Sequence, residues 1–173
     1  MIIGFLDETS PQTTANTQRL WSCGHPTLIK NTTKFRANTF GFYSINGCSV
    51  LEFHDHSKKE DVCEFLQTIR KMNPGADIVI ILDNFRSHHA NITREYAEMN
   101  NIKLVYLPPY SPDLNPIEYI WKSIRRIISR TFIQDLDHLK QIIFDAFKKF
   151  GYSLSFAASW IEKFLGNNCS IVS

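Results

Sequence analysis

The sequence has few cysteines, and no two of them form a metal-binding motif. Its four cysteines are scattered over 173 residues without a C-x-x-C pair, so neither a zinc ribbon nor a disulfide framework is indicated. No apolar run approaches the roughly 20 residues that a membrane-spanning helix needs. Met1 opens directly into a core-like segment without the basic region of a signal peptide. We therefore expect a reduced, intracellular protein.

Acidic residues are missing from two long stretches of a chain that is otherwise nearly neutral. The formal net charge is only +2, but no acid occurs from Thr9 to Leu51 or from Tyr119 to Gln134. Local basic stretches of this kind are suited to binding phosphate groups. The cations they contain include Arg19, Lys34, Arg36, Lys122, Arg125, Arg126 and Arg130.

Two continuous apolar runs predict buried strands, and each run ends in an aspartate. Residues 1–6 lead into Asp7, and residues 78–82 lead into Asp83. Runs of this type are typical of central strands covered on both faces. Each acid is expected where its strand leaves the core, at the sheet edge where α/β proteins bind ligands. The length and the 43% hydrophobic content predict one α/β domain.

The segments between these two runs predict how the acids come together. After an irregular polar segment at 8–37, two strands at 38–45 and 48–54 flank Asn46-Gly47, a strong hairpin signal. A helix follows, with Ser57 as its cap and Glu60 at its third position. Its expected buried stripe ends at Met72, before Asn73. A right-handed crossover through this helix would place the strand at 78–82 parallel to the first and beside it.

The third acid stands at a helix start. After a weaker helix at 87–100 and a strand at 102–107, Asn115 is expected to cap a helix, with Pro116 in its first position and Glu118 three residues after the cap. Apolar residues then recur at helical spacing, and Trp121 is one of them. Helices are also expected from Asp135 onward and over 153–165. Glu118 has two readings at this point: a capping-box partner of the Asn115 amide, or a metal ligand.

The other candidate ligands also have structural alternatives. Asp83 could form a turn with Asn84, and Asp7 could be a solvated acid at a strand end. Their joint occurrence with Glu118 in this strand order favours a metal site, because Mg²⁺-like ions prefer carboxylate oxygens. His54 and His56 could bind a transition metal, but the lack of a third ligand in the nearby sequence favours solvated histidines.

Two segments resemble the second and third catalytic motifs of mariner-like transposases and their prokaryotic insertion-sequence relatives. They read LDNFRSHH at 82–89 and PPYSPDLNPIE at 108–118, and 34 residues separate Asp83 from Glu118, the spacing characteristic of that group. Residues 6–10 resemble the first motif. Trp21, with Gly24 and Pro26, resembles a tryptophan-containing stretch that follows it.

The resemblance implies a ribonuclease H-like fold, with a mixed five-stranded sheet flanked by helices and extra helices at the C-terminal end. It implies that Asp7, Asp83 and Glu118 are catalytic and hold two Mg²⁺ or Mn²⁺ ions. The implied reaction cuts DNA at transposon ends and joins the freed 3′-hydroxyl to target DNA, in a dimeric assembly. Two alternatives stay open: a nuclease on the same ribonuclease H-like fold without strand transfer, and an inactive DNA-binding or dimerisation remnant of a decayed element.

The resemblance also suggests where DNA binds. Asn84 and His88, beside the second acid, are candidates to support the ligands, and Trp21 either packs locally or stacks on a base. Members of this family usually carry helix-turn-helix domains before the first aspartate, whereas six residues precede Asp7 here. We expect a single catalytic domain over 1–173, in the prokaryotic cytoplasm at the nucleoid. Either the domain stands alone, or a separate chain recognises the DNA. The expected DNA-binding residues are Arg19, Trp21, Lys34, Arg36, Lys122, Arg125, Arg126 and Arg130.

Overall fold

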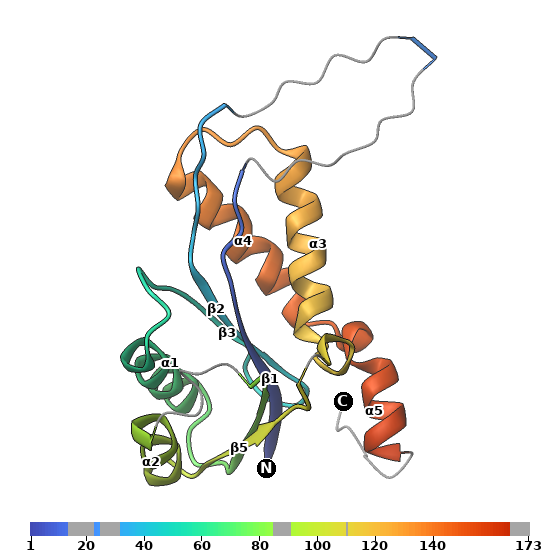
Figure 1. Cartoon of the computed structure of the whole chain (residues 1–173). Helices are drawn as coiled ribbons and strands as arrows, with labels where there is room; N and C mark the ends of the chain where they lie inside the picture. The colour runs from blue at the N-terminus through green and yellow to red at the C-terminus, as the bar shows by residue number, and fades with distance from the viewer. Residues whose placement is uncertain (14–22, 25–31, 85–90, 110, 167–173) are drawn as a thin grey trace.

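The protein is built around one mixed five-stranded sheet (Figure 1). The computed structural model describes residues 1–13, 23–24, 32–84, 91–109 and 111–166. The strand order is β3-β2-β1-β4-β5, with β1 antiparallel to β2 and parallel to β4. The predicted crossover is therefore confirmed. The strands are β1 (Ile2–Thr9), β2 (Thr39–Ser44), β3 (Val50–Phe53), β4 (Ile78–Leu82) and β5 (Ile102–Tyr106).

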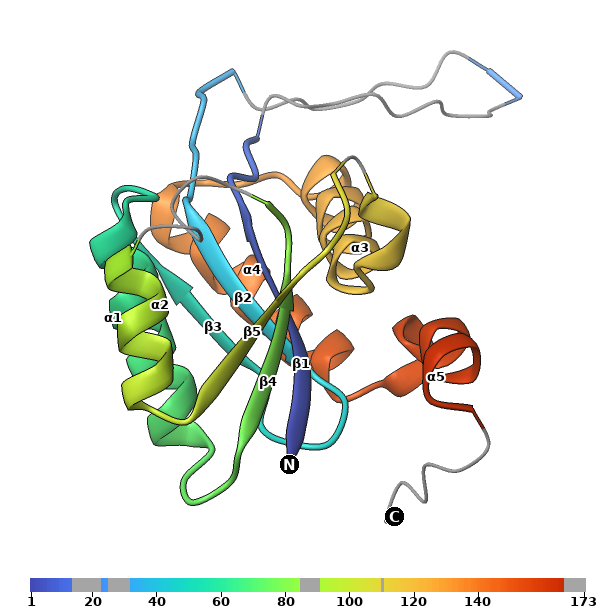
Figure 2. The same ribbon diagram turned by 60° about the horizontal axis from the view of Figure 1, so that its bottom comes forward.

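Helices cover both faces of the sheet (Figure 2). Because side chains alternate along a strand, β1 sends Leu6 toward α1 and Phe5 toward α3 and α4, into two separate apolar clusters. Asp7 has the same parity as Phe5 and therefore lies on the α3 side. The helices are α1 (Lys59–Met72), α2 (Asn91–Met99), α3 (Ile117–Arg130), α4 (Leu136–Gly151) and α5 (Ala158–Phe164), with short 3₁₀ helices η2 (Pro112–Leu114) and η3 (Leu154–Phe156).

Helix α1 begins slightly later than the sequence predicts. Its N-cap is Lys58, whose backbone N–H donates to the Asp61 carboxylate at 2.7 Å, so the capping box uses Asp61 and not Glu60. Ser57 instead exchanges hydrogen bonds with the Asn38 side chain. Met72, predicted to be buried, is 52% exposed because it falls in the last turn of the helix.

The hairpin between β2 and β3 forms, but Asn46-Gly47 is not a tight two-residue turn. The last pair of the ladder is Phe42 with Val50, which leaves a wider loop. Neither Asn46 nor Gly47 has positive φ. The Asn46 side chain accepts from the Ile3 N–H and donates to the Met1 carbonyl. A Cβ on Gly47 would lie 2.7 Å from the Asn73 Oδ1 atom. These two residues therefore serve contacts with other segments.

The remaining helices form where the sequence predicts them, but their ends are shifted. Helix α4 begins directly after Asp135, close to the predicted position, and the Asp135 side chain caps it by accepting from the His138 N–H. The helix expected over 153–165 is divided into η3 and α5. The predicted start of α2 at Ser87 lies outside the described residues. Within the described part of the chain, every helix is too short or too polar to cross a membrane.

Candidate catalytic site

Asp7 lies inside β1 and not at its end, so that part of the sequence prediction is wrong. Strand β1 continues to Thr9 because β2 pairs with it antiparallel along this stretch, and Asp7 faces Gly41 in the ladder. Asp83 directly follows β4, as predicted. The parallel register pairs Phe5 with Ile81, and continuing it by two residues brings Asp83 level with Asp7. Two carboxylates therefore meet although only one strand ends there.

Glu118 does not act as a capping residue. The N-cap of α3 is Pro116, and the Asn115 backbone N–H donates to the Pro112 carbonyl at 2.9 Å. The Asn115 backbone N–H, which a capping box would need as its donor, is thus already bonded within the η2 turn. The Asn115 carbonyl accepts from the Glu118 N–H at 3.0 Å. The Glu118 side chain is left to face the pocket beside α3.

One pocket brings the three predicted acids together. Asp7 comes from β1, Asp83 from the end of β4 and Glu118 from the first turn of α3. The segment between β5 and α3 forms the opposite wall. The residues that line the pocket are Asp7, Asp83, Asn84, Leu107, Pro108, Pro109, Ser111, Pro112, Asn115 and Glu118.

The buried acid of this group is strongly perturbed. Asp7 is 8% exposed. Burial, followed by the charges of Glu118 and Asp83, raises its pKa from 3.8 to about 8. Asp83, in contrast, is exposed, and the Glu118 side chain is 39% exposed. The site therefore joins one buried carboxyl group, which is easily protonated, to two accessible ones.

Trp121 orients the buried acid, a role that the sequence reading missed. Its indole Nε1–H donates to the Asp7 Oδ2 atom at 2.9 Å, which opposes the rise of the Asp7 pKa. The ring is 1% exposed and stacks on Phe147 at 5.4 Å between centroids. It also crosses β2 so closely that a Cβ on Gly41 would lie 2.5 Å from its Cζ2 atom. The available signal was spacing, because residues i and i+3 share a helix face and Trp121 follows Glu118 by three.

Arg125 is closely associated with the acids. Its Nη2 atom lies 3.7 Å from the Glu118 carboxylate, and its Nη1 donates to the Thr9 hydroxyl at 3.2 Å. It therefore connects the start of α3 to the end of β1. Asn84 donates to the Leu107 carbonyl and so joins the ends of β4 and β5 beside the pocket.

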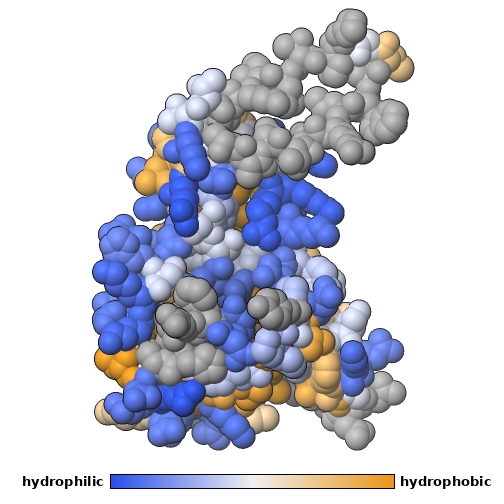
Figure 3. Space-filling model, in the orientation of Figure 1, coloured by the Kyte–Doolittle hydropathy of each residue, from blue (hydrophilic) through white to orange (hydrophobic). Residues whose placement is uncertain are grey.

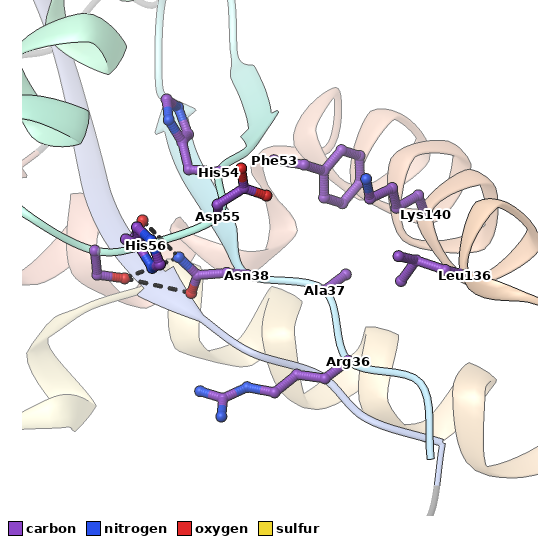
Figure 4. Close-up of a pocket in the computed structure, with 10 residues that line it drawn as sticks. Arg36, Ala37, Asn38, Phe53, His54, Asp55, His56, Leu136 and Lys140 are labelled. Atoms are coloured by element: carbon purple, nitrogen blue, oxygen red, sulfur yellow. Dashed lines mark hydrogen bonds between the residues drawn. The ribbon is translucent and has the colours of Figure 1, made fainter. Parts of the chain in front are cut away.

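The other predicted DNA-binding residues do not form one surface. Lys122 and Arg126 are exposed on α3 and line a groove toward α5. Arg130 is exposed near the end of α3, and Lys34 and Arg36 are exposed before β2. Arg36 lines a separate pocket with His56 and Lys140 (Figure 4). Arg19, Trp21 and His88 lie outside the described residues.

His54 and His56 do not form a metal pair. In Figure 4 the two imidazole rings point in different directions. The prediction of a solvated His54 is wrong, because its side chain is 11% exposed and its ring nitrogens lie 3.2 Å from Glu52 and 3.6 Å from Asp61. These acids come from β3 and α1, and Glu64 lies close to the same group. His54 thus joins a cluster of carboxylates that the sequence reading did not place near it.

Comparisons with known proteins agree with this architecture. The sequence profile of the DDE superfamily endonucleases matches residues 3–140. Tc3 transposase of Caenorhabditis elegans is 42% identical over 69 residues, which cover 38% of this chain and 21% of the relative. The protein y4pE/y4sA of Sinorhizobium fredii is 37% identical over 71 residues, covering 40% of this chain and 50% of that protein.

A solved structure shows the same fold. The Mos1 mariner paired-end complex with Mn superposes with a TM-score of 0.69 at 18% identity, over 93% of this chain and 52% of the Mos1 chain. The fold is therefore ribonuclease H-like, as the sequence predicts. The matches span about half or less of each of these three proteins. With the family profile covering most of the sequence, the chain belongs to the DDE superfamily endonucleases.

Proposed function

We propose that this chain is the catalytic domain of a transposase that cuts DNA at the ends of a transposable element and joins the freed 3′-hydroxyl to target DNA. The observation that carries the proposal is the convergence of Asp7, Asp83 and Glu118 from three separate elements in one pocket. Family membership and the likeness to Tc3 transposase support the same reaction. No feature of the described residues favours a nuclease without strand transfer or an inactive remnant.

The residues of the pocket fit hard divalent cations. The polar side chains among the described lining residues are carboxylates, amides and a hydroxyl, without thiolate or imidazole. The Asn115 Oδ1 atom is buried there and accepts no hydrogen bond. A buried acceptor without a partner is costly unless a bound group interacts with it. Carboxylate, amide and hydroxyl oxygens are the ligands that suit Mg²⁺ and Mn²⁺. Manganese in the Mos1 complex supports the same choice.

Asp7, Asp83 and Glu118 would hold two Mg²⁺ or Mn²⁺ ions. When bound, such ions activate a nucleophile and stabilise the leaving oxygen of a phosphodiester. Trp121 holds the Oδ2 atom of Asp7 through its indole N–H. Arg125 holds Glu118 next to the end of β1. Both contacts limit the rotamers of the two acids, which reduces the reorganisation needed on metal binding.

DNA is the proposed partner. The exposed cations on α3, together with Lys34 and Arg36, would bind phosphates and give affinity without reading sequence. Asn84 would support the second acid through its bond to the end of β5. We further propose that residues 1–173 act as one catalytic domain, as a homodimer, on DNA of the prokaryotic nucleoid. Recognition of the transposon ends would then come from a separate chain or domain.

Nicking of supercoiled plasmid DNA tests the proposal. The wild-type chain should nick the plasmid with Mg²⁺ or Mn²⁺ and not in EDTA, with an end-recognition chain added if the domain alone is inactive. Asp83→Asn and Glu118→Gln should each lower the rate by orders of magnitude, because each removes a charged oxygen ligand. Glu95→Gln, which replaces an exposed acid on α2 outside the pocket, is the matched control and should leave the nicking rate unchanged.

Joining of a labelled oligonucleotide with a free 3′-hydroxyl separates transposition from simple hydrolysis. A transposase forms joined product with the metal, whereas a nuclease yields only nicked plasmid. Full cleavage by Glu118→Gln, under conditions where the wild type is active, would refute the assignment of the site.

A further inference from the structure

A groove runs between α3 and α5, next to the acid pocket but separate from it. Figures 1 and 2 show α5 near the end of α3 that begins after η2, and η3 contacts both helices. The groove is lined by residues of both helices and by the short 3₁₀ helices. The lining residues that matter here are Tyr119, Lys122, Arg126, Trp160, Lys163 and Phe164.

The charge of the groove suits a phosphate chain. Lys122 and Arg126 stand on one wall and Lys163 on the other, and all three are exposed. Among the described lining residues, Asp113 is the one acid. Cations on two facing walls can contact successive phosphates of a strand that lies between them.

Aromatic rings lie between these cations. Tyr119 is 44% exposed and Phe164 is 49% exposed, both unusually high for their size. Trp160 packs edge-on against Phe5 at 4.9 Å and against Phe164 at 5.1 Å, which anchors the wall on the core. Figure 3 shows hydrophobic surface where α3 approaches α5 and hydrophilic surface farther along α3. Exposed rings beside cations are the composition of single-strand binding surfaces, because unpaired bases offer a face to stack.

The geometry of α3 connects this groove to the acids. At about 100° per residue, Lys122 lies roughly 40° around the helix from Glu118, Arg126 about 80° and Tyr119 about 100°. The acid pocket and the groove are therefore lined by consecutive residues, Glu118 in the pocket and Tyr119 in the groove. A strand whose phosphate lies at Glu118 can reach Lys122 and then the rings.

We propose that the groove between α3 and α5 binds an unpaired stretch of the DNA strand that extends from the acid pocket. This inference rests on the proposed function, since it takes the pocket as the place of strand cleavage. Duplex DNA would use the cations of the groove but not its rings, because its base faces are already stacked. The substrate class assigned here is thus DNA with single-stranded nucleotides next to the cut site.

Binding to matched DNA probes tests this assignment. One probe is a blunt labelled duplex, and the other carries an unpaired extension of about six nucleotides, within the range that single-strand sites cover. Both are titrated by fluorescence anisotropy into protein with Asp83→Asn, which prevents cleavage. The extended probe should bind more tightly. Tyr119→Ala and Phe164→Ala should each weaken binding of the extended probe by roughly 5- to 100-fold, and blunt binding by less than about twofold.

A charge variant gives an independent readout. Lys163→Gln should reduce the slope of log K against log salt for the extended probe by about 1. Phe144→Ala and Lys148→Gln are the matched controls, because both residues are exposed on α4 away from the groove. They should leave both affinities unchanged. Melting curves identify any variant that fails to fold. If Phe164→Ala does not fold, the salt dependence of Lys163→Gln still tests the groove.

Four results would overturn the assignment. Equal losses of affinity for the blunt and the extended probe would show that the groove contacts duplex DNA. Unchanged affinities of the groove variants would show that the groove does not bind the unpaired strand, and plasmid nicking by the same variants with Asp83 restored would leave the proposed function intact. A change of oligomeric state in the groove variants, measured by light scattering, would make it a protein interface. If the wild type neither binds nor nicks any DNA, the proposed function fails together with the groove.

Discussion

Replacing Asp7 with asparagine should stabilise the metal-free protein, and the gain should grow as the pH rises. The folded-state pKa of Asp7 is raised from 3.8 to about 8. Between these values the folded chain binds more protons than the unfolded chain, so the free energy of unfolding falls with rising pH. Asparagine carries no charge, and its side-chain oxygen can still accept the Trp121 indole N–H.

The size of the effect follows from the same pKa shift. One proton taken up on folding gives a slope of at most about 1.4 kcal/mol per pH unit. From pH 5 to pH 7 the wild type should therefore lose up to roughly 3 kcal/mol relative to Asp7→Asn. That is a large share of the roughly 5–15 kcal/mol that stabilises a typical domain. Well below the unfolded pKa of 3.8 the difference between the two proteins should stop changing with pH, because Asp7 is then protonated in both the folded and the unfolded chain.

Urea unfolding in EDTA at pH 5, 6, 7 and 8 measures the difference, with Asp113→Asn as a control for the loss of an exposed acid. Adding Mn²⁺ at pH 7 should stabilise the wild type and have little effect on Asp7→Asn, because the cation relieves the repulsion among the three carboxylates. Parallel pH curves for the wild type and Asp7→Asn would show that burial and neighbouring charges do not perturb Asp7 as the structure implies.

Two further substitutions test how Asp7 is held. Trp121→Phe removes a hydrogen bond to a buried carboxylate and should lower the free energy of unfolding by about 1.5–3 kcal/mol with metal present. It should also raise the Mn²⁺ concentration needed for half-maximal nicking. An unchanged Mn²⁺ requirement would show that Trp121 only packs against its neighbours. Gly41→Ala places a Cβ 2.5 Å from the Trp121 ring. The resulting overpacking should lower stability by about 1–3 kcal/mol, measured by a melting curve. A variant as stable as the wild type would show that the ring can move aside freely.

The sheet and the acid cluster were predictable because they depend on long apolar runs. The segments at 2–6 and 78–82 are continuous enough to identify central strands, and a right-handed crossover leaves one simple way to place them side by side. The positions of Asp7 and Asp83 follow from that arrangement. Even the wrong prediction that Asp7 ends its strand did not affect the cluster, since register alone brings the two acids level.

Local caps and turns were less predictable because several neighbouring residues can fill the same role. Asp61 replaces Glu60 in the first box, one residue along the chain. At α3 the capping pattern is present in the sequence, but the η2 turn takes the Asn115 N–H and leaves Glu118 for the pocket. The hydrogen bond from Trp121 to Asp7 joins residues 114 positions apart, so the spacing from Glu118 could place the indole near the site but could not identify Asp7 as its acceptor.

The parity of β1 explains why the three acids have unequal roles. Side chains alternate along the strand, so Asp7 shares with Phe5 the face that α3 and α4 cover, and it is buried beneath Trp121. Asp83 follows its strand and Glu118 starts its helix, so both stay open to the pocket. Burial makes Asp7 the acid whose charge the fold tolerates least without a cation. Metal binding, folding stability and pH are therefore coupled mainly through Asp7, while Asp83 and Glu118 remain accessible to an incoming cation and to DNA.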